Sequence, residues 1–352
     1  MKRLLLILGF VLIFSGCSLE KEEIEHNPEM TTRMVFDENK DFIYYDDISL
    51  SSHQLVRQSK TTDETIIIDE SWCFSTVSVV GDDIYYVTYQ DNGKDFEVIH
   101  CNNADVADKD ILFRGQIERW DNWLTDYLYI KEGKVYFSNS DKQLWLYDSG
   151  KVTIIKEDML SSAIYNNILY YTKTDGSLYE MDLDTAEEKL LVTSQTIFKK
   201  PNLQWWFDNF DEICYMENIV RTQDKVYFLV KSTPDPYTIG RLFSCNLNGK
   251  NLKEVLPDVV IKKFDVYENK IYFVGETKID GTYVKGFYVS DTKGKVNKIE
   301  SQEQEIPKLG FMIFDSMVYF HYTEDFATSL YQGELSNNKL INIKLLKPIE
   351  TE

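Results

Sequence analysis

Hydrophobic positions along the chain recur as a short motif, in which an aliphatic residue is followed by Tyr and then by a second Tyr or Phe. The segments between the motifs contain short β-rich runs and no helical pattern of ten residues. The mean spacing is roughly 46 residues, so each motif marks one copy of a repeating unit. The seven copies are Ile43-Tyr44-Tyr45, Ile84-Tyr85-Tyr86, Val135-Tyr136-Phe137, Leu169-Tyr170-Tyr171, Val226-Tyr227-Phe228, Ile271-Tyr272-Phe273 and Val318-Tyr319-Phe320.

The sixth repeat shows the unit most clearly. Turn residues such as Glu268-Asn269 separate its β-rich runs, and the fourth and seventh repeats follow the same order. Because the runs are short and consecutive, each repeat is predicted to form a four-stranded antiparallel sheet, which excludes a parallel βαβ arrangement. The four runs of the sixth repeat cover 264–267, 270–274, 286–290 and 296–299.

The repeats predict an all-β fold, a β-propeller with seven four-stranded blades. A lone four-stranded sheet cannot bury both apolar faces, whereas a closed ring covers each blade with its neighbours. The paired aromatics of each motif point to opposite faces of a blade, so we expect them in the core. Residues 33–346 form one propeller domain. The interval from Leu169 to Val226 is longer than the one before it, so six or eight blades stay open.

The fourth repeat resembles the YWTD repeat of lipoprotein-receptor propellers. The similarity is carried by Leu169-Tyr170-Tyr171-Thr172 and by the run from Gly176 to Asp184. The chain from about 33 to 346 is similar to bacterial lipoprotein propellers related to that repeat, which implies a β-propeller. The Trp of the signature is Tyr or Phe throughout, and the receptor domains have six blades. Receptor ligand binding is therefore not transferred to this chain.

The first seventeen residues have the order of a secretory signal, with a basic start and an apolar run from 4 to 14. That run is about 16 Å long as a helix, too short to span a bilayer. Its end resembles the lipobox of bacterial lipoproteins, which implies a signal peptide over 1–16 and a lipidated Cys17. An ordinary cleaved signal is the alternative. Residues 17–32 are polar, rich in Glu and predicted to be a flexible tether. We expect a lipid-anchored protein on the extracytoplasmic side of the membrane.

The chain is acidic, with 58 Asp and Glu against 38 Lys and Arg and a formal net charge of −20. Nucleic acid is therefore excluded as a partner, and the charge is typical of a soluble surface. The spacing of Cys73, Cys101, Cys214 and Cys245 matches no metal motif. We expect no disulfide between Cys101 and Cys245, because repeats that far apart in a ring hold these residues beyond bonding distance.

Connection lengths predict which face of the propeller binds. The first and third connections of each repeat are short, as at Asn166-Asn167 and Asn337-Asn338, and lie on one face, here called the hairpin face. The second connections and the segments between blades lie on the other face, here called the long-loop face. Long segments such as 194–211, 232–240, 276–285 and 322–328 are predicted there. Binding residues concentrate in such loops on rigid scaffolds.

Tryptophans gather in the connections of the long-loop face, together with carboxylates and amides. This mixture suits stacking on a sugar ring or a peptide, although plugging of the channel or covering of blade ends explains the same residues. Trp145 is the exception, in a predicted strand. The predicted ligand-binding residues are Trp72, Trp120, Asp121, Trp123, Trp205, Trp206, Phe207, Asp208 and Tyr237.

Catalytic motifs are missing from the sequence. It holds no Gly-x-Ser-x-Gly elbow, no His-Glu-x-x-His and no phosphate-binding glycine loop, so no cofactor or metal is predicted. We expect a non-catalytic propeller that binds a carbohydrate, a peptide or a cell-envelope protein. The alternative is a polysaccharide lyase or glycosidase, whose carboxylates would come from Asp121, Asp208, Asp211 or Glu212, although no spacing selects a pair.

Overall fold

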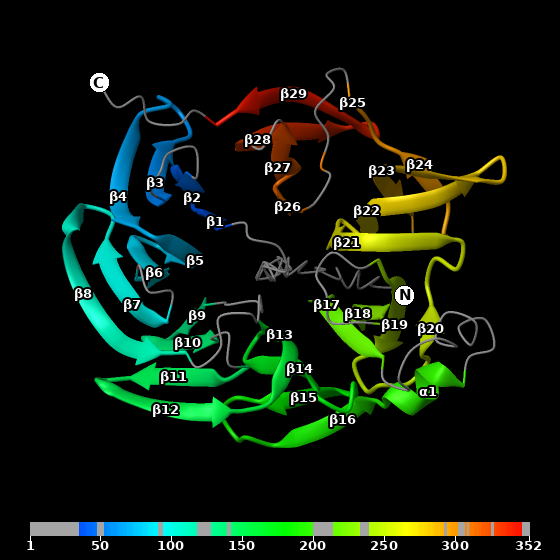
Figure 1. The fold of residues 1–352 in the computed structure, drawn as a ribbon, viewed down its shortest axis with the longest axis horizontal. Coiled ribbons are helices and arrows are strands. Elements are labelled where there is room, and N and C mark those ends of the chain that lie inside the picture. The colour runs from blue at the N-terminus through cyan, green and yellow to red at the C-terminus, as the bar shows by residue number, and fades with distance from the viewer. Residues whose placement is uncertain are drawn as a thin grey trace, which may run out of the picture.

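Seven antiparallel sheets stand around a common axis in a ring, as the computed structural model shows (Figure 1). The structure describes residues 35–47, 53–90, 94–117, 128–138, 142–199, 214–232, 239–291, 294–301, 307, 310–324 and 327–346. Each sheet takes its four principal strands from one stretch of the chain, in the order of the sequence. The predicted seven-bladed propeller is confirmed, and six or eight blades are excluded.

The first four blades each contain four strands. Blade 1 comprises β1 (Phe36–Glu38), β2 (Phe42–Asp47), β3 (His53–Ser59) and β4 (Thr65–Ser71). Blade 2 comprises β5 (Cys73–Val80), β6 (Asp83–Tyr89), β7 (Asp95–Asn102) and β8 (Asp105–Gln116). Blade 3 comprises β9 (Leu128–Lys131), β10 (Lys134–Ser138), β11 (Leu144–Asp148) and β12 (Lys151–Lys156). Blade 4 comprises β13 (Met159–Tyr165), β14 (Ile168–Lys173), β15 (Leu178–Asp182) and β16 (Glu188–Val192).

The last three blades follow a short helix, α1 (Ser194–Phe198), whose first turn is capped by the Thr193 hydroxyl. Blade 5 comprises β17 (Tyr215–Arg221), β18 (Lys225–Lys231), β19 (Arg241–Asn246) and β20 (Lys253–Glu254). Blade 6 comprises β21 (Val259–Tyr267), β22 (Lys270–Ile279), β23 (Thr282–Ser290) and β24 (Val296–Lys298). Blade 7 comprises β26 (Phe311–Phe314), β27 (Met317–Glu324), β28 (Ala327–Ser336) and β29 (Lys339–Leu345), with β25 (Glu300–Ser301) at its outer edge.

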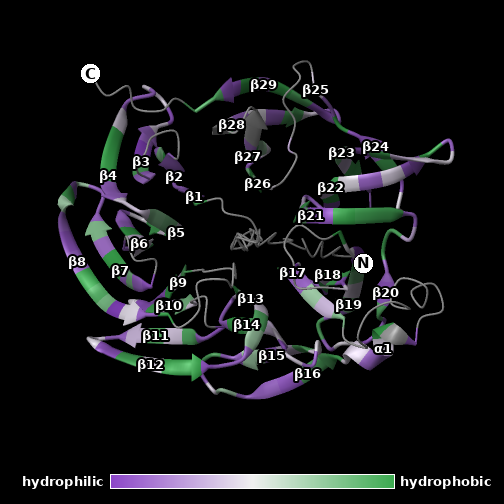
Figure 2. Cartoon of the chain, in the orientation of Figure 1, coloured by the Kyte–Doolittle hydropathy of each residue, from purple (hydrophilic) through white to green (hydrophobic). Residues whose placement is uncertain are grey.

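The repeated motifs lie on the second strand of each blade, where the core is deepest. In blade 1, Tyr44 packs in a cluster shared with blade 2, whereas Tyr45 packs in a cluster shared with blade 7. Both side chains are at most 2% exposed. This alternation follows from the period of two along a strand. The predicted core role is confirmed for the other aromatics of the motifs, whereas Tyr85 and Tyr227 are only half-buried. The outer strands, such as β8 and β12, instead alternate hydrophobic and hydrophilic residues along their length (Figure 2).

Tight turns form the hairpin face, as predicted. Asn166 and Asn167 join β13 to β14, and both have positive φ angles, 46° and 67°. Asn337 and Asn338 do the same between β28 and β29, at 49° and 60°. Two successive residues with positive φ define the type I′ turn, whose twist matches that of the strands, and Asn tolerates this conformation. The connections here therefore leave little room for a binding loop.

Two segments that were predicted as long loops are strands instead. In blade 6 the strands β22 and β23 run on to Ile279 and Thr282, so that Asp280 and Gly281 alone form the turn. In blade 7, β27 ends at Glu324 and β28 begins at Ala327. The prediction of loops over 276–285 and 322–328 was wrong because both segments continue the pairing of their strands beyond the body of the blade. The chain between β16 and β17, from 193 to 214, does hold a long connection.

Among the described residues, the ring closes without a strand exchanged between its first and last blades. The whole of blade 1 comes from the N-terminal part of the propeller and the whole of blade 7 from the C-terminal part. This boundary, here called the seam, is filled by side chains. The rings of Phe36 and Tyr319 lie with their centroids 4.1 Å apart, and the Tyr319 hydroxyl donates a hydrogen bond of 2.8 Å to Glu38 Oε2. Closure therefore depends on packing and polar contacts rather than on a sheet shared by both ends.

Candidate functional site

Most of the predicted binding residues cannot be placed. Trp72 lies within the described part of the chain. The lipidation residue Cys17 and the rest of the predicted set lie outside the described residues, so those assignments stay predictions. The ligand-binding residues concerned are Trp120, Asp121, Trp123, Trp205, Trp206, Phe207, Asp208 and Tyr237.

Trp72 is the single residue between β4 and β5, at the long-loop face where blade 1 passes to blade 2. Its side chain is 40% exposed, which is high for the largest apolar side chain. The residue before it, Ser71, pairs across the sheet with His53 and donates a hydrogen bond of 2.9 Å to the carbonyl of Tyr89. The indole is thus carried on backbone that two strands hold in place.

A buried acid and an imidazole lie at the same end of blade 1. The Nδ1 atom of His53 is 2.6 Å from Asp46 Oδ2, and Asp46 is 8% exposed. Burial raises the pKa of the Asp46 carboxyl, and the hydrogen bond with His53 opposes that rise. The His53 side chain is one-third exposed, so it connects the buried carboxylate to the surface at the end of the strand that precedes Trp72.

The opposite side of blade 1 carries a second polar pair at this end. Gln54 is 3% exposed, and its amide nitrogen donates a hydrogen bond of 2.7 Å to Glu70 Oε1. Across the seam, His321 lies on β27, and burial lowers the pKa of His321 to about 4. Its imidazole is therefore neutral at physiological pH, with one ring nitrogen as a donor and the other as an acceptor. We call the two polar pairs of blade 1 and Trp72 the blade 1 polar end, which comprises Asp46, His53, Gln54, Glu70 and Trp72.

No motif in the sequence singled out His53 or His321, so the polar end was not predicted. The signal was present in the repeats. The position directly after the aromatic doublet is Asp46 in the first repeat and His321 in the seventh. The other five repeats have no ionisable residue there, and they carry Val87, Ser138, Thr172, Leu229 and Val274. Aligning the seven repeats position by position would therefore have singled out blades 1 and 7, which meet at the seam.

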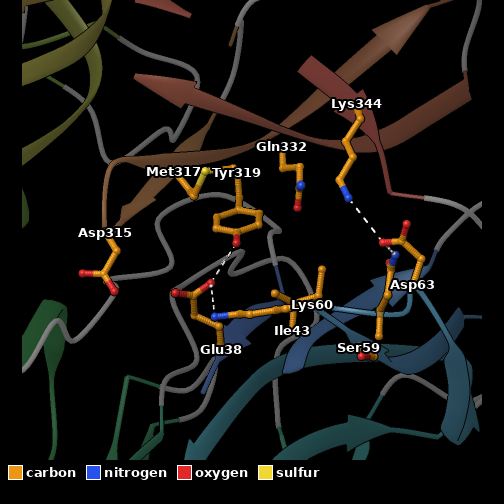
Figure 3. Close-up of a pocket in the computed structure, with 11 residues that line it drawn as sticks. Glu38, Ile43, Ser59, Lys60, Asp63, Asp315, Met317, Tyr319, Gln332 and Lys344 are labelled. Carbon is orange, nitrogen blue, oxygen red and sulfur yellow. Dashed lines mark hydrogen bonds and ion pairs between the residues drawn. The ribbon is translucent and has the colours of Figure 1, made fainter. Parts of the chain in front are cut away.

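A second candidate site is a cavity of about 210 Å³ at the seam, here called the seam pocket (Figure 3). Its walls come from blades 1 and 7, and it opens near the hairpin face, where the sequence predicted little capacity to bind. The pocket arises because two tight turns of different blades leave a gap between them. It is lined by Glu38, Ile43, Gln58, Ser59, Lys60, Asp63, Asp315, Met317, Tyr319, Gln332 and Lys344.

Two ion pairs stand at different ends of the seam pocket (Figure 3). Lys60 Nζ is 3.2 Å from Glu38 Oε2, and Lys344 Nζ is 3.3 Å from Asp63 Oδ1. Burial and the charge of Glu38 raise the pKa of Tyr319, so its hydroxyl stays protonated and serves as a donor. The pocket therefore offers charges of both signs, a phenol and amides around an apolar floor, a set suited to binding rather than to bond breaking.

Neither a membrane helix nor a metal centre is found among the described residues. No helix there is long and apolar enough to cross a bilayer. No group of three or more His, Cys, Asp or Glu side chains in the same ranges is placed to hold a metal ion.

Comparisons with known proteins show the fold and no closer kinship. No protein-family model matches the chain, and no curated protein matches it. Among solved structures, the β-propeller domain of the Trilobed protease from Pyrococcus furiosus has a TM-score of 0.56 at 12% identity, over 91% of this chain and 97% of that one. It is described as having an open velcro topology, and the described strands of this chain likewise include none shared between the first and last blades.

Two further solved structures have the same overall shape. The tricorn protease matches with a TM-score of 0.58 and 11% identity over 90% of this chain, which spans about a third (34%) of that protein's length. YCF48 bound to D1 peptide matches with a TM-score of 0.51 and 10% identity, over 82% of this chain and 89% of that one. At these identities the likeness establishes the propeller fold alone.

Proposed function

We propose that this chain is a lipid-anchored, extracytoplasmic propeller that binds a peptide, a glycan or a protein partner on its long-loop face and does not catalyse a reaction. The observation that carries the proposal is Trp72, an exposed Trp that directly follows the residue paired with His53 on the neighbouring strand. An exposed aromatic next to hydrogen-bonding groups is the usual composition of a recognition site. The lipobox resemblance supports the anchor.

The rigidity of the support favours binding over a merely structural Trp. Backbone on both sides of Trp72 is paired, because Ser71 belongs to β4 and Cys73 to β5. The His53 imidazole is held by Asp46 at 2.6 Å, so its orientation is set before any ligand arrives. Preformed polar groups reduce the entropy lost on binding. The peptide bound by YCF48 supplies a precedent for a propeller of this shape with a peptide ligand.

The lyase or glycosidase alternative depends on a pair of carboxylates rather than on a serine nucleophile. The carboxylates considered for that chemistry, Asp121, Asp208, Asp211 and Glu212, lie outside the described residues.

Binding is tested with the full-length lipoprotein, extracted in detergent and applied to peptide and glycan arrays. For any array ligand that binds, Trp72→Ala should weaken affinity at least tenfold, because a stacked aromatic at the centre of a site is a typical hot spot. The control is Leu190→Ala, which removes another exposed apolar side chain (45% exposed) on the outer strand β16. If Trp72→Ala has a native circular dichroism spectrum and unchanged affinity, then the long-loop face at blade 1 does not bind the ligand.

The predicted tryptophans outside the described residues need a separate variant. Replacing Trp120, Trp123, Trp205 and Trp206 by Ala together should abolish binding of the same ligand. The anchor is tested by metabolic labelling with an alkyne fatty acid. Label should appear in the wild type and disappear in Cys17→Ala, and label retained in that variant would exclude Cys17 as the lipidation site.

A further inference from the structure

Some polar groups that line the seam pocket make no hydrogen bond or ion pair with other described residues. Both contacts of Glu38 use the same oxygen, since Oε2 accepts from Tyr319 and pairs with Lys60. Its other oxygen, Oε1, accepts no hydrogen bond within the described ranges, although the side chain is only 10% exposed. Asp315 takes part in no ion pair among the described residues. One end of the pocket therefore holds acceptor capacity that the fold leaves open.

The open acceptors lie at the same end of the pocket. Glu38 accepts the hydrogen bond of the Tyr319 hydroxyl, and Asp315 lines the pocket on the same side as Glu38 (Figure 3). The lining carries three carboxylates in all against the ammonium groups of Lys60 and Lys344. Each Lys is paired with its own acid, so the uncompensated charge is negative. A ligand that completes this site brings one positive charge.

The remaining lining is polar on one side and apolar on the other. The half-buried Gln332 extends toward the space between the two ion pairs, and its amide makes no hydrogen bond to another described residue (Figure 3). Ile43 and Met317 supply apolar surface, and the ring of Tyr319 stands beside them. Such a lining suits a ligand with hydroxyl groups at its edge and a C–H face, and about 210 Å³ accommodates one six-membered ring with its substituents.

We propose that the seam pocket binds a small monocationic, polyhydroxylated ring of the amino sugar class. The ammonium group binds between Glu38 Oε1 and Asp315, and the hydroxyl groups bind Gln332 and the Lys60 side of the pocket. The apolar face of the sugar ring packs on Met317 and Tyr319. This site is independent of the long-loop face, because it lies on the hairpin side of the disc.

Ligand in the seam pocket would touch both ends of the propeller at once. Blade 1 contributes Glu38 and Lys60, and blade 7 contributes Asp315 and Gln332. Because a ligand that binds only the closed ring stabilises it by mass action, occupancy should raise the unfolding temperature. Because its lining comes from both blades, the pocket exists only when blades 1 and 7 are in contact.

The test is isothermal titration of the full chain in detergent with D-glucosamine, D-glucose and cyclohexylamine as probes. Glucosamine should bind at least tenfold more tightly than glucose, which lacks the charge, and than cyclohexylamine, which lacks the hydroxyls. Asp315→Asn should lose at least tenfold in affinity for glucosamine while it keeps the affinity for glucose. Asn suits this position because Asp315 has a φ of 42°, a conformation that Asn tolerates.

The matched control is Glu268→Gln. Glu268 occupies the equivalent turn position in blade 6, with a φ of 48°, and is not part of the seam pocket. This variant should leave the affinity for glucosamine unchanged. It thereby separates the effect of removing the Asp315 carboxylate from the effect of lowering the negative charge of the protein in general. No binding of glucosamine, equal binding of glucose, or equal loss in the two variants would each overturn the proposal. Ligand binding at Trp72 is unaffected by any of these outcomes, so the two sites fail independently.

Discussion

The seam between blades 7 and 1 differs from the boundary between blades 4 and 5, although the repeats that form them are alike. Fifteen buried residues, all within the described ranges, form the cluster at the boundary of blades 4 and 5, whereas eight form the cluster at the seam. At the inner boundary a Tyr165 hydroxyl donates to the carbonyl of Ile219 at 3.1 Å, and both groups are buried. At the seam the Tyr319 hydroxyl donates to a carboxylate.

The two boundaries use different groups. Blades 4 and 5 are joined by a segment that adds Ile197 of α1 and Cys214 to their shared core. At the seam, the ion pair of Lys344 with Asp63 takes part in the contact. The core at the seam is no smaller than the cores between blades 2 and 3 and between blades 3 and 4, which also contain eight buried residues each. The core between blades 4 and 5 is therefore the exception, because its connecting segment contributes apolar side chains to it.

The largest effect is expected from Phe228→Ala. Phe228 is fully buried in the cluster between blades 4 and 5, so truncation leaves a cavity in the larger core. The free energy of unfolding should fall by about 3–5 kcal/mol. Urea denaturation followed by tryptophan fluorescence measures the change. A loss below about 1 kcal/mol would mean that this boundary does not support the fold as its packing indicates.

A pH-dependent effect is expected from Asp37, on the other side of β1 from the seam. Its carboxylate accepts from the backbone N–H of Val79 in blade 2 at 2.6 Å, yet burial raises the pKa of Asp37 to about 7. The folded state thus holds this proton more tightly than the unfolded state, whose pKa is near 3.8. The stability contributed by Asp37 should therefore fall as pH rises from about 4 to 7.

Asp37→Asn isolates that contribution, because the amide oxygen can still accept from Val79 and no charge is buried. The variant should be more stable than the wild type at pH 8 by roughly 2 kcal/mol, with the difference shrinking toward pH 4. The contribution of Glu188 to stability changes with pH in the opposite direction. Burial opposes ionisation of Glu188, but contacts with Lys156, Lys173 and Tyr171 hold its pKa at about 2. The stability that Glu188 contributes is therefore lost as pH falls below 4.5. A constant difference between variant and wild type over pH 4–8 would contradict the assignment.

A matched pair of hydroxyl deletions compares the two boundaries directly. Tyr319→Phe removes a hydrogen bond to a carboxylate at the seam, and we expect a loss of about 1.5–3 kcal/mol. Tyr165→Phe removes a hydrogen bond to a carbonyl at the inner boundary, with an expected loss of about 0.5–1.5 kcal/mol. Thermal unfolding of both variants gives the ranking. The reverse order would show that the polar bond at the seam is not what holds it.

The smallest effect is expected from Lys344→Ala. Its ion pair with Asp63 spans the seam, but the two side chains are 49% and 63% exposed. Solvent screens such a pair, so the free energy of unfolding should change by less than about 1 kcal/mol, and the change should shrink further in 1 M salt. A larger loss that salt does not affect would indicate that the lysine stem, rather than its charge, seals the pocket.

Periodicity along the chain was enough to predict the ring, the blade number and the buried aromatics. Each of these depends on contacts within one repeat or between successive repeats, which recur with the motif. The seam pocket could not be predicted in this way, because Glu38 and Tyr319 are 281 positions apart. The lengths of β22 and β23 were also missed, since the end of β22 at Ile279 and the start of β23 at Thr282 pair beyond the part of the blade that the repeats share.

The polar end at Trp72 was predicted in part. The exposed indole follows from its place between two blades, whereas the role of His53 depends on a carboxylate on the neighbouring strand. Such a pair is set by the cross-strand register, which a single repeat does not reveal. The predictions for the remaining tryptophans concern connections whose sequences differ from one repeat to the next, so no internal comparison constrains them.

Because every blade is assembled from its own consecutive strands, the circle has no obligatory starting point. A gene that opened between β4 and β5, with a linker spanning Leu346 and Val35, would still encode seven complete sheets. The boundary without a covalent connection would then lie between the first two blades, and the gap beside Glu38 would be bridged. Moving the break in this way would make the position of the chain ends, rather than any side chain, decide which boundary opens first.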